Sequence, residues 1–295
     1  MKLLILILFL SLNVIASVKV SVSIKPIHSI VALLTEDVTV PDLLINDNQT
    51  AHHFFMRPSH ARKITNSDLV VLVDKNFEKG FQKITSNLEN GKIFYFSDTS
   101  KKIINSNHDE HDEHDEHDEH DEHDEHDEHD EEILNPHLWL DRENIVNFAK
   151  NLSNKLMEID PENEKQFQKN LDLFLRKFSE VSRINLSNDD KKIVILQSNS
   201  AEYFLNDFNI KDFQIISNNH EGNISMKKYN EIITLSEGNK IACLVVDDNS
   251  NSDVLKNLAK ELNTQLVFVD IVGHDTKDFY DFFQSISERF STCLQ

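Results

Sequence analysis

A run of eight identical His-Asp-Glu triplets, residues 108–131, constrains the fold of this chain more than any other feature. The run and the acid that follows it, Glu132, contain no apolar side chain, so no packed core can be built from them. We therefore expect residues 104–132 to form a disordered loop. The rest of the 295-residue chain must supply the folded structure.

The acidity of the protein is concentrated in this run. The formal net charge is −21, but residues 109–132 supply 17 of the 51 acidic residues. The remainder has 34 acidic against 30 basic residues, which is an ordinary balance. No basic surface suited to nucleic acid is indicated, so we expect no nucleic-acid partner.

The first 16 residues are typical of an export signal. Lys2 gives a positive start, and the apolar stretch Leu3–Ala16 ends at a small residue. This stretch is too short to span a bilayer comfortably, so we predict a signal peptide over residues 1–16 that is cleaved after Ala16. A membrane anchor is the alternative. No Cys near the cleavage site indicates a lipid anchor, and we expect a soluble periplasmic protein.

Short apolar runs alternate with helical stretches on both sides of the repeat. Before it, we predict strands over Val18–Ile24, Leu69–Asp74 and Ile93–Ser97. Helices are expected from Ser59, a suitable N-cap, and over Phe77–Leu88.

After the repeat, four strands alternate with four helices. The predicted strands are Lys192–Ser198, Phe213–Ile216, Ile241–Asp247 and Gln265–Asp270, and the predicted helices are Ala201–Asp207, Ser225–Glu237, Ser252–Leu262 and Lys277–Phe290. This alternation predicts an α/β fold with parallel sheets covered by helices.

One long helical pattern separates the two series. Asp160 is a good N-cap and Pro161 suits the first helical position, and apolar residues recur at spacings of three and four from Phe167 to Val181. A helix over residues 161–184 would be about 36 Å long, which suits a strut between two lobes. A core helix within one large domain is the alternative.

The predicted organisation is thus two α/β lobes joined by a helix. The N-terminal lobe covers residues 17–159, the linker helix residues 160–185 and the C-terminal lobe residues 186–295. A cleft between lobes is a favoured place for a ligand.

Two cysteines, Cys243 and Cys293, remain in the mature chain. An even pair in an oxidising compartment favours a disulfide. Two unpaired buried thiols are the alternative, and a metal site is less well supported because no C-x2-C spacing is present.

Eight of the 15 histidines belong to the repeat. Imidazole binds zinc when it is neutral, so the repeat offers many overlapping weak sites and is predicted to act as an auxiliary, low-affinity zinc trap or sensor. A solvated acidic linker is the alternative. The predicted auxiliary ligands are His108, His111, His114, His117, His120, His123, His126 and His129.

Five segments in the order found here resemble the periplasmic metal-binding components of zinc and manganese ABC importers. They are SIKPIHSIV (23–31), HHFFMRPSHARKITNSDLVVLV (52–73), PHLWLDREN (136–144), DPENEKQFQKNLDLF (160–174) and VDIVG (269–273). The resemblance covers nearly the whole mature chain. It implies two Rossmann-like lobes joined by a long rigid helix, with metal in the cleft. The His-rich loop and the Cys pair resemble the zinc-specific branch.

The resemblance also assigns the cleft ligands. It implies that His52, His137 and Asp270 bind the metal. At one position the chain departs from the family, because Ser198 stands where zinc proteins have His and manganese proteins have Glu. A neutral serine is a poor zinc ligand. His220 is a candidate substitute ligand, and His53 and His60 are weaker candidates for the rim of the cleft.

Together with these features, the resemblance implies a monomeric zinc receptor that delivers metal to an ABC permease and its ATPase, with Zn²⁺ favoured over Mn²⁺ as the cargo. A periplasmic zinc buffer or chaperone with a degenerate cleft site is the alternative, as is a manganese receptor. An enzyme is not expected, since no H-E-x-x-H motif or positioned general base is present.

Overall fold

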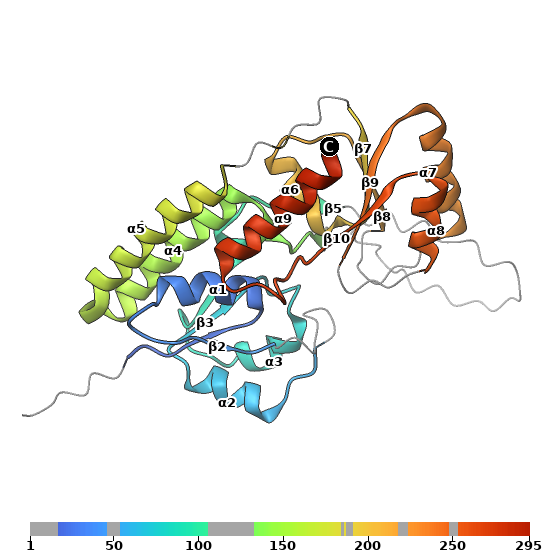
Figure 1. Ribbon diagram of the computed structural model, residues 1–295. Helices are drawn as coiled ribbons and strands as arrows, with labels where there is room; N and C mark the ends of the chain where they lie inside the picture. The colour runs from blue at the N-terminus through green and yellow to red at the C-terminus, as the bar shows by residue number, and fades with distance from the viewer. Residues whose placement is uncertain are drawn as a thin grey trace, which may run out of the picture.

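The computed structural model describes residues 17–45, 54–105, 133–183, 186, 191–217, 224–247 and 253–295. These residues form two lobes, each built on a four-stranded parallel sheet with helices packed around it (Figure 1). The predicted α/β fold class is confirmed.

The sheet of the first lobe has the order β2-β1-β3-β4. Its strands are β1 (Val20–Val22), β2 (Asp42–Leu43), β3 (Leu69–Leu72) and β4 (Ile93–Tyr95). Its helices are α1 (Lys25–Leu34), α2 (Pro58–Asn66) and α3 (Gln82–Thr85), with 3-10 turns η1 (Lys79–Phe81) and η2 (Phe96–Thr99). Every residue of β1 and β3 is buried, as expected for parallel strands that are covered on both faces.

The sheet of the second lobe has the order β10-β9-β7-β8. Its strands are β7 (Ile193–Ser198), β8 (Phe213–Ser217), β9 (Ile241–Asp247) and β10 (Gln265–Val269). Its helices are α6 (Glu202–Asp207), α7 (Met226–Gly238), α8 (Asp253–Glu261) and α9 (Phe279–Leu294), with η5 (Asn199–Ala201) before α6. Counted along the chain within each lobe, both sheets have the same order, 2-1-3-4.

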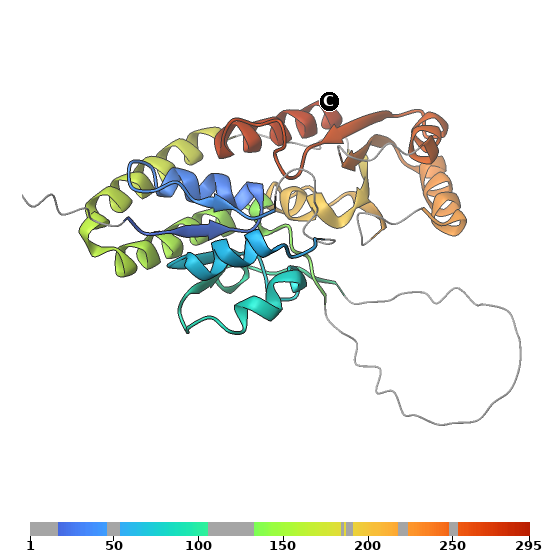
Figure 2. The ribbon, with the colours of Figure 1, turned by 90° about the horizontal axis from the view of Figure 1, so that it is seen from below.

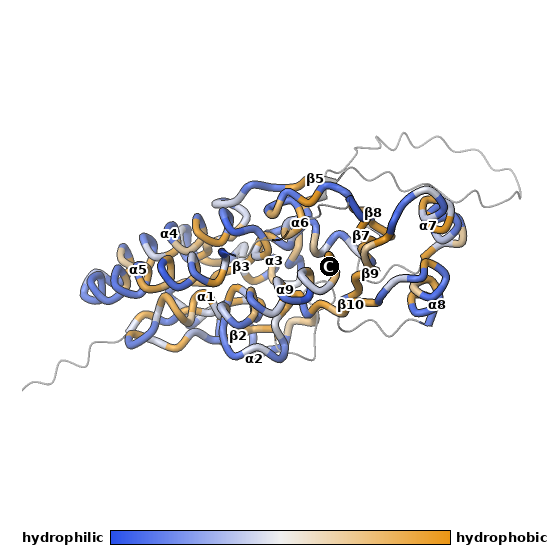
Figure 3. Tube along the Cα trace, turned by 45° about the horizontal axis from the view of Figure 1, so that its top comes forward, coloured by the Kyte–Doolittle hydropathy of each residue, from blue (hydrophilic) through white to orange (hydrophobic). Residues whose placement is uncertain are grey.

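The two faces of the second sheet belong to different cores. Ile195, Leu244 and Val246 point to the cluster that includes α7 and α8. Leu196 and Val245, on the other face, belong to the main core, which also contains the buried residues of the first lobe. Along the helices, hydrophilic and hydrophobic stretches alternate (Figure 3), as expected for helices that bury one face.

In the sequence, two long helices separate the strands of the first sheet from those of the second. They are α4 (Arg142–Ile159) and α5 (Glu164–Val181), with the 3-10 turn η4 (Pro161–Asn163) between them. They lie side by side along one end of the molecule (Figures 1 and 2). Helix α5 packs against α1 of the first lobe and α9 of the second. It is therefore the expected long connecting helix, and its apolar face is also part of the shared core.

Three local predictions need correction. The N-cap of α2 is Arg57, not Ser59, because Pro58 occupies the first helical position. Asp160 ends α4 and begins η4, so the α-helix itself starts only at Glu164. Ile104 and Asn105, which we placed in the loop, form β5 and pair antiparallel with β6 (Ile133–Leu134).

The disulfide prediction is confirmed. Cys243 in β9 and Cys293 near the end of α9 are bonded, with their Cα atoms 5.4 Å apart. Both residues are buried, so the bond attaches α9 to strand β9 of the second sheet from within the core.

Candidate metal centre

The carboxyl end of β1 in the first lobe lies close to the carboxyl end of β10 in the second. The Lys25 ammonium, at the start of the helix after β1, donates to the carbonyl oxygen of His274, which follows β10. Ligands of open parallel sheets bind outside the carboxyl ends of the strands. A ligand is therefore expected to bind in the region between these strand ends.

Only part of the predicted ligand set can be located. His137 and Asp270 are described by the structure, whereas His52, His53, His220 and the eight repeat histidines lie outside the described residues. Within the described ranges no group of three or more His, Cys, Asp and Glu residues could hold a metal ion. The predicted ligand set therefore remains a prediction.

His137 lies at the start of η3 (Leu138–Leu140) and is 2% exposed. Its ring packs edge-on against Trp139, with the ring centroids 5.2 Å apart. Its Nδ1 is 2.7 Å from Oδ1 of Asn135. The ring is thus held on two sides before any ligand arrives.

Asn135 determines which nitrogen of His137 can bind a metal. The Asn135 amide group donates to the carbonyl oxygen of Asn199 at 2.9 Å and to Oε2 of Glu202 at 3.2 Å. This fixes the orientation of the amide, so the oxygen that faces His137 is an acceptor and Nδ1 must be the donor. A neutral ring then carries its lone pair on Nε2. Histidines that bind metals have the same arrangement, with the other nitrogen donating to a fixed acceptor.

Asp270 follows β10 directly. Its Oδ1 accepts from the backbone N–H groups of Val272 and Gly273, at 3.2 and 2.8 Å. Gly273 has a φ of 72°, and a Cβ there would lie 2.8 Å from Oγ1 of Thr276, so the turn that holds Asp270 requires glycine. The carboxylate is partly exposed at the edge of the sheet.

A hydrogen bond brings the segments of His137 and Asp270 together. The indole Nε1 of Trp139 donates to the carbonyl oxygen of Ile271 at 2.8 Å. Trp139 is two residues after His137 and Ile271 is one residue after Asp270, so the two candidate ligands come from adjoining segments of different lobes.

Ser198 is also placed at this edge. It is the last residue of β7 and is 1% exposed. Its hydroxyl accepts from the N–H of Ser200 at 3.2 Å and donates to Oδ2 of Asp247 at 3.3 Å. The position at which the family resemblance implies a metal ligand therefore has a hydroxyl that bonds a carboxylate on the neighbouring strand.

His60 has a structural role in α2. Its Nδ1 accepts from the N–H of Arg57 at 3.2 Å, which caps the start of the helix. Burial, with a smaller effect of Arg57 and Lys63, holds the pKa of His60 below its ordinary value. A neutral ring that accepts at Nδ1 carries its proton on Nε2, so it offers no lone pair to a metal.

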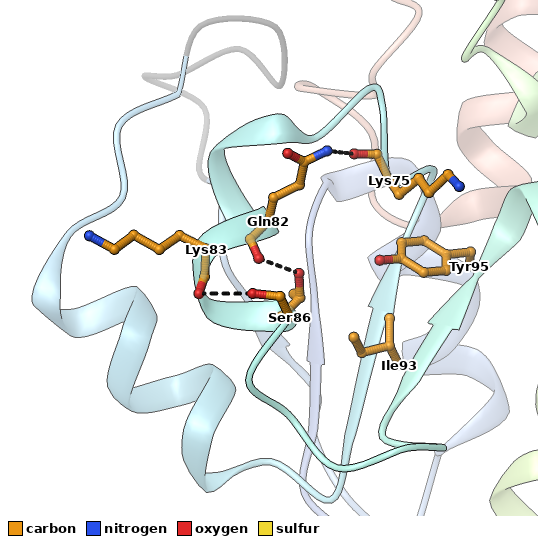
Figure 4. Close-up of a pocket in the computed structure, with 7 residues that line it drawn as sticks. Lys75, Gln82, Lys83, Ser86, Ile93 and Tyr95 are labelled. Atoms are coloured by element: carbon orange, nitrogen blue, oxygen red, sulfur yellow. Dashed lines mark hydrogen bonds between the residues drawn. The ribbon is translucent and has the colours of Figure 1, made fainter.

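An open pocket of about 600 Å³ lies between α3 and β4 in the first lobe (Figure 4). Its lining includes Lys75, Gln82, Lys83 and Tyr95. It contains two lysines but no carboxylate or imidazole group, so it is unsuited to a metal cation.

Two residues of this region, Asn135 and Asp247, were not anticipated from the sequence. Asn135 stands directly before Pro136-His137, but a single Asn gives no recognisable pattern. Asp247 was predicted as the end of a strand, and only the pairing of β9 with β7 shows what lies beside it.

Comparison with known proteins decides the family. Residues 20–293 match the family described as zinc-uptake complex component A, periplasmic, or ZnuA. The chain belongs to this family.

Individual relatives agree with this assignment. The high-affinity zinc uptake system protein ZnuA of Yersinia pestis is 24% identical over 301 residues, covering 95% of this chain and 92% of its own. The manganese ABC transporter substrate-binding lipoprotein ScaA of Streptococcus gordonii is 21% identical over 289 residues, covering 90% and 87%. A Mn-bound periplasmic metal-binding protein of Candidatus Liberibacter asiaticus has a similar fold, with a TM-score of 0.75 at 20% identity, covering 94% of this chain and 100% of its own.

As a member of the ZnuA family, the protein is the metal-binding receptor component of an ABC importer and not an enzyme. The family is extracytoplasmic, and its ligand is a divalent metal ion. In the part of the chain that the structure describes, no helix has both the length and the apolar character needed to cross a membrane.

Proposed function

We propose that this ZnuA-family receptor captures Zn²⁺ in the periplasm and delivers it, as a monomer, to an ABC permease and its ATPase. His137 carries the proposal, because it is buried between the lobes and its Nδ1 is committed to Asn135. Zinc accepts imidazole and carboxylate ligands, and a receptor with three protein ligands leaves a coordination position for water. We assign these three roles to His52, His137 and Asp270.

The repeat is proposed to be an auxiliary trap and not the transport site. Overlapping His and Asp/Glu groups in a chain without a core bind weakly, since each binding event must order the chain. Manganese is the second candidate cargo, favoured by Ser198, which removes an imidazole from the edge of β7. A zinc buffer is a third candidate, in which the repeat would supply all of the binding.

Calorimetric titration with zinc, and separately with manganese, tests these proposals on the mature chain with and without residues 108–132. The deletion is suited to the fold: Asn105 and Ile133 are paired in the β5–β6 ladder, so only Ser106 and Asn107 would join them. Two-residue connections are the commonest between antiparallel strands.

We expect one tight zinc site that survives the deletion. His137→Ala should weaken it by more than the roughly 100-fold that loss of a residue supporting a ligand can cause. His28→Ala is the matched control, because His28 is partly buried in α1 and bonded to the carbonyl oxygen of Pro41. If deleting the repeat abolishes tight zinc binding, the zinc-buffer proposal would replace the receptor proposal. Tighter binding of manganese would replace zinc as the cargo.

A further inference from the structure

The strand order of the second sheet marks one place as the natural ligand site. The chain passes from β7 to β8 on one side of the sheet and then crosses to β9 on the other side of β7. Open α/β sheets bind ligands in the crevice at such a reversal, outside the carboxyl ends of the two strands. In this lobe those ends are Ser198 of β7 and Asp247 of β9.

The side chains of these two residues lie on the face of the sheet that points to the first lobe. Leu196 and Val245 are paired across β7 and β9 and belong to the core shared by both lobes. Ser198 and Asp247 are each two residues further along their strands, so they are on the same face. Asp247 is partly exposed there, whereas Ser198 is buried.

Hydroxyl groups hold the Asp247 carboxylate in place. Oγ of Ser200 donates to Oδ1 at 2.9 Å, and Oγ of Ser198 donates to Oδ2 at 3.3 Å. The backbone N–H of Asp247 donates to Oε1 of Gln197. A carboxylate oxygen can accept more than one bond, and carboxylates that bind metals are themselves held by hydrogen bonds of this kind.

The same cluster is connected to His137. The amide group of Asn135 bonds the imidazole on one side and the carbonyl oxygen of Asn199 on the other. Asn199 is the residue between the two serines that hold Asp247. One side chain therefore links the metal-binding imidazole of the first lobe to the strand end that carries the carboxylate.

We propose that Asp247 binds the transported metal ion in place of the ligand that the Ser198 position lacks. This inference rests on the proposed function and names a fourth ligand for the same site. The carboxylate is one strand away from the family position, and the two serines orient it. Among the described residues, His137, Asp247 and Asp270 do not form a group that could hold a metal, so the proposal requires their segments to come closer when the ion binds. An imidazole and two carboxylates are ligands that zinc accepts, and a second carboxylate also favours manganese, which prefers oxygen ligands.

The test is a competition titration of the full mature chain against a chelator, with Zn²⁺ and then Mn²⁺, so that only tight binding is counted. Asp247→Asn keeps the shape and the acceptor oxygen but removes the charge, and we expect at least a tenfold loss of affinity. Asp253→Asn is the matched control, because Asp253 is an exposed acid at the start of α8. Titration with Co²⁺ adds a spectroscopic readout, since a change of ligand alters its visible absorption.

A second variant distinguishes the loss of a ligand from a folding defect, because a misfolded Asp247→Asn protein would not regain affinity from a new imidazole. Ser198→His in the Asp247→Asn background restores an imidazole at the family position, and zinc affinity should recover at least tenfold. If Asp247→Asn binds both metals as wild type does, with an unchanged cobalt spectrum, Asp247 is not a ligand. The proposed function would still stand in that case, provided that His137→Ala abolishes tight zinc binding. If wild type has no tight site, both proposals fail.

Discussion

The two lobes have the same strand order but carry different chemistry at the same point of their sheets. In the second lobe the reversal between β7 and β9 presents Asp247, partly exposed and held by serine hydroxyls. In the first lobe the corresponding reversal, between β1 and β3, is occupied by Glu78. Its Oε2 accepts from the N–H groups of Val73 and Asp74, at 2.7 and 3.2 Å, and the residue is 1% exposed.

The two carboxyl groups differ in how deeply they are buried. Desolvation raises the pKa of Glu78 to about 8, although the backbone N–H groups act in the opposite direction. The Ser23 hydroxyl is near enough to influence the group, yet within the described residues neither Ser23 Oγ nor Glu78 Oε1 has a hydrogen bond of proper geometry. One topology thus provides the same location twice: in the first lobe it holds a buried carboxyl group with a raised pKa, and in the second a partly exposed carboxylate.

The largest expected effect concerns the cross-link that only the second lobe has among the described residues. Replacing both members of the Cys243–Cys293 pair by Ser should lower the free energy of unfolding by about 4 kcal/mol, because the bond closes a loop across a sequence separation of 50 residues. This difference in the free energy of unfolding is measured by denaturant unfolding of the oxidised wild type, the reduced wild type and the double variant. Equal stabilities of all three would show that α9 needs no covalent attachment to the sheet.

The next prediction tests the hydrogen-bonded link between His137 and the second lobe. Asn135→Ala should weaken metal binding by roughly 10- to 100-fold, because the imidazole loses the acceptor that fixes its tautomer. Asn144→Ala is the matched control: Asn144 is equally buried, and its amide group bridges the backbone of Lys101. The two variants should lose similar stability, but only the first should lose affinity. Equal affinities would mean that Asn135 is merely structural.

The last effect concerns the first lobe and is spread over several pH units. Because the folded-state pKa of Glu78 is raised from 4.5 to about 8, folding favours its protonated form. Its contribution to stability is complete below pH 4.5 and is lost as the pH rises towards 8, by at most about 1.4 kcal/mol per pH unit. Glu78→Gln keeps a neutral group of the same shape and should remove this slope.

Unfolding measured from pH 5 to 8 should therefore show wild type losing stability relative to Glu78→Gln, while their metal affinities stay equal. Parallel stability curves would mean that Glu78 is ionised in the folded protein. A fall in affinity would contradict the contrast between the lobes, because it would make the first reversal part of the site.

Much of the fold followed from local patterns. β9 was predicted at its observed bounds, and α7 within one residue, because a continuous buried run and a capped helix each leave a signal within a few neighbouring residues. Helices α1 and α4 were not predicted, although α4 begins with the N-cap Asp141.

The site was less accessible to sequence reasoning. His137 and Asp270 came from a resemblance, and nothing in the sequence indicated that Trp139 bonds the carbonyl oxygen of Ile271 or that Ser198 meets Asp247. These contacts join residues that are 132 and 49 positions apart. They depend on strand order and lobe packing, which no short segment encodes.

The β5–β6 ladder would limit how far a metal ion bound by the proposed auxiliary trap could move from the body of the protein. The 27 residues between Asn105 and Ile133 start and end at the same paired strands. At about 3.4 Å per residue, the midpoint of that segment can reach only about 45 Å from the ladder. An ion confined to a sphere of this radius has an effective concentration on the order of millimolar near the cleft. A weak trap tethered in this way would act as a local reservoir, filling when external zinc is transiently high and supplying the cleft when it falls.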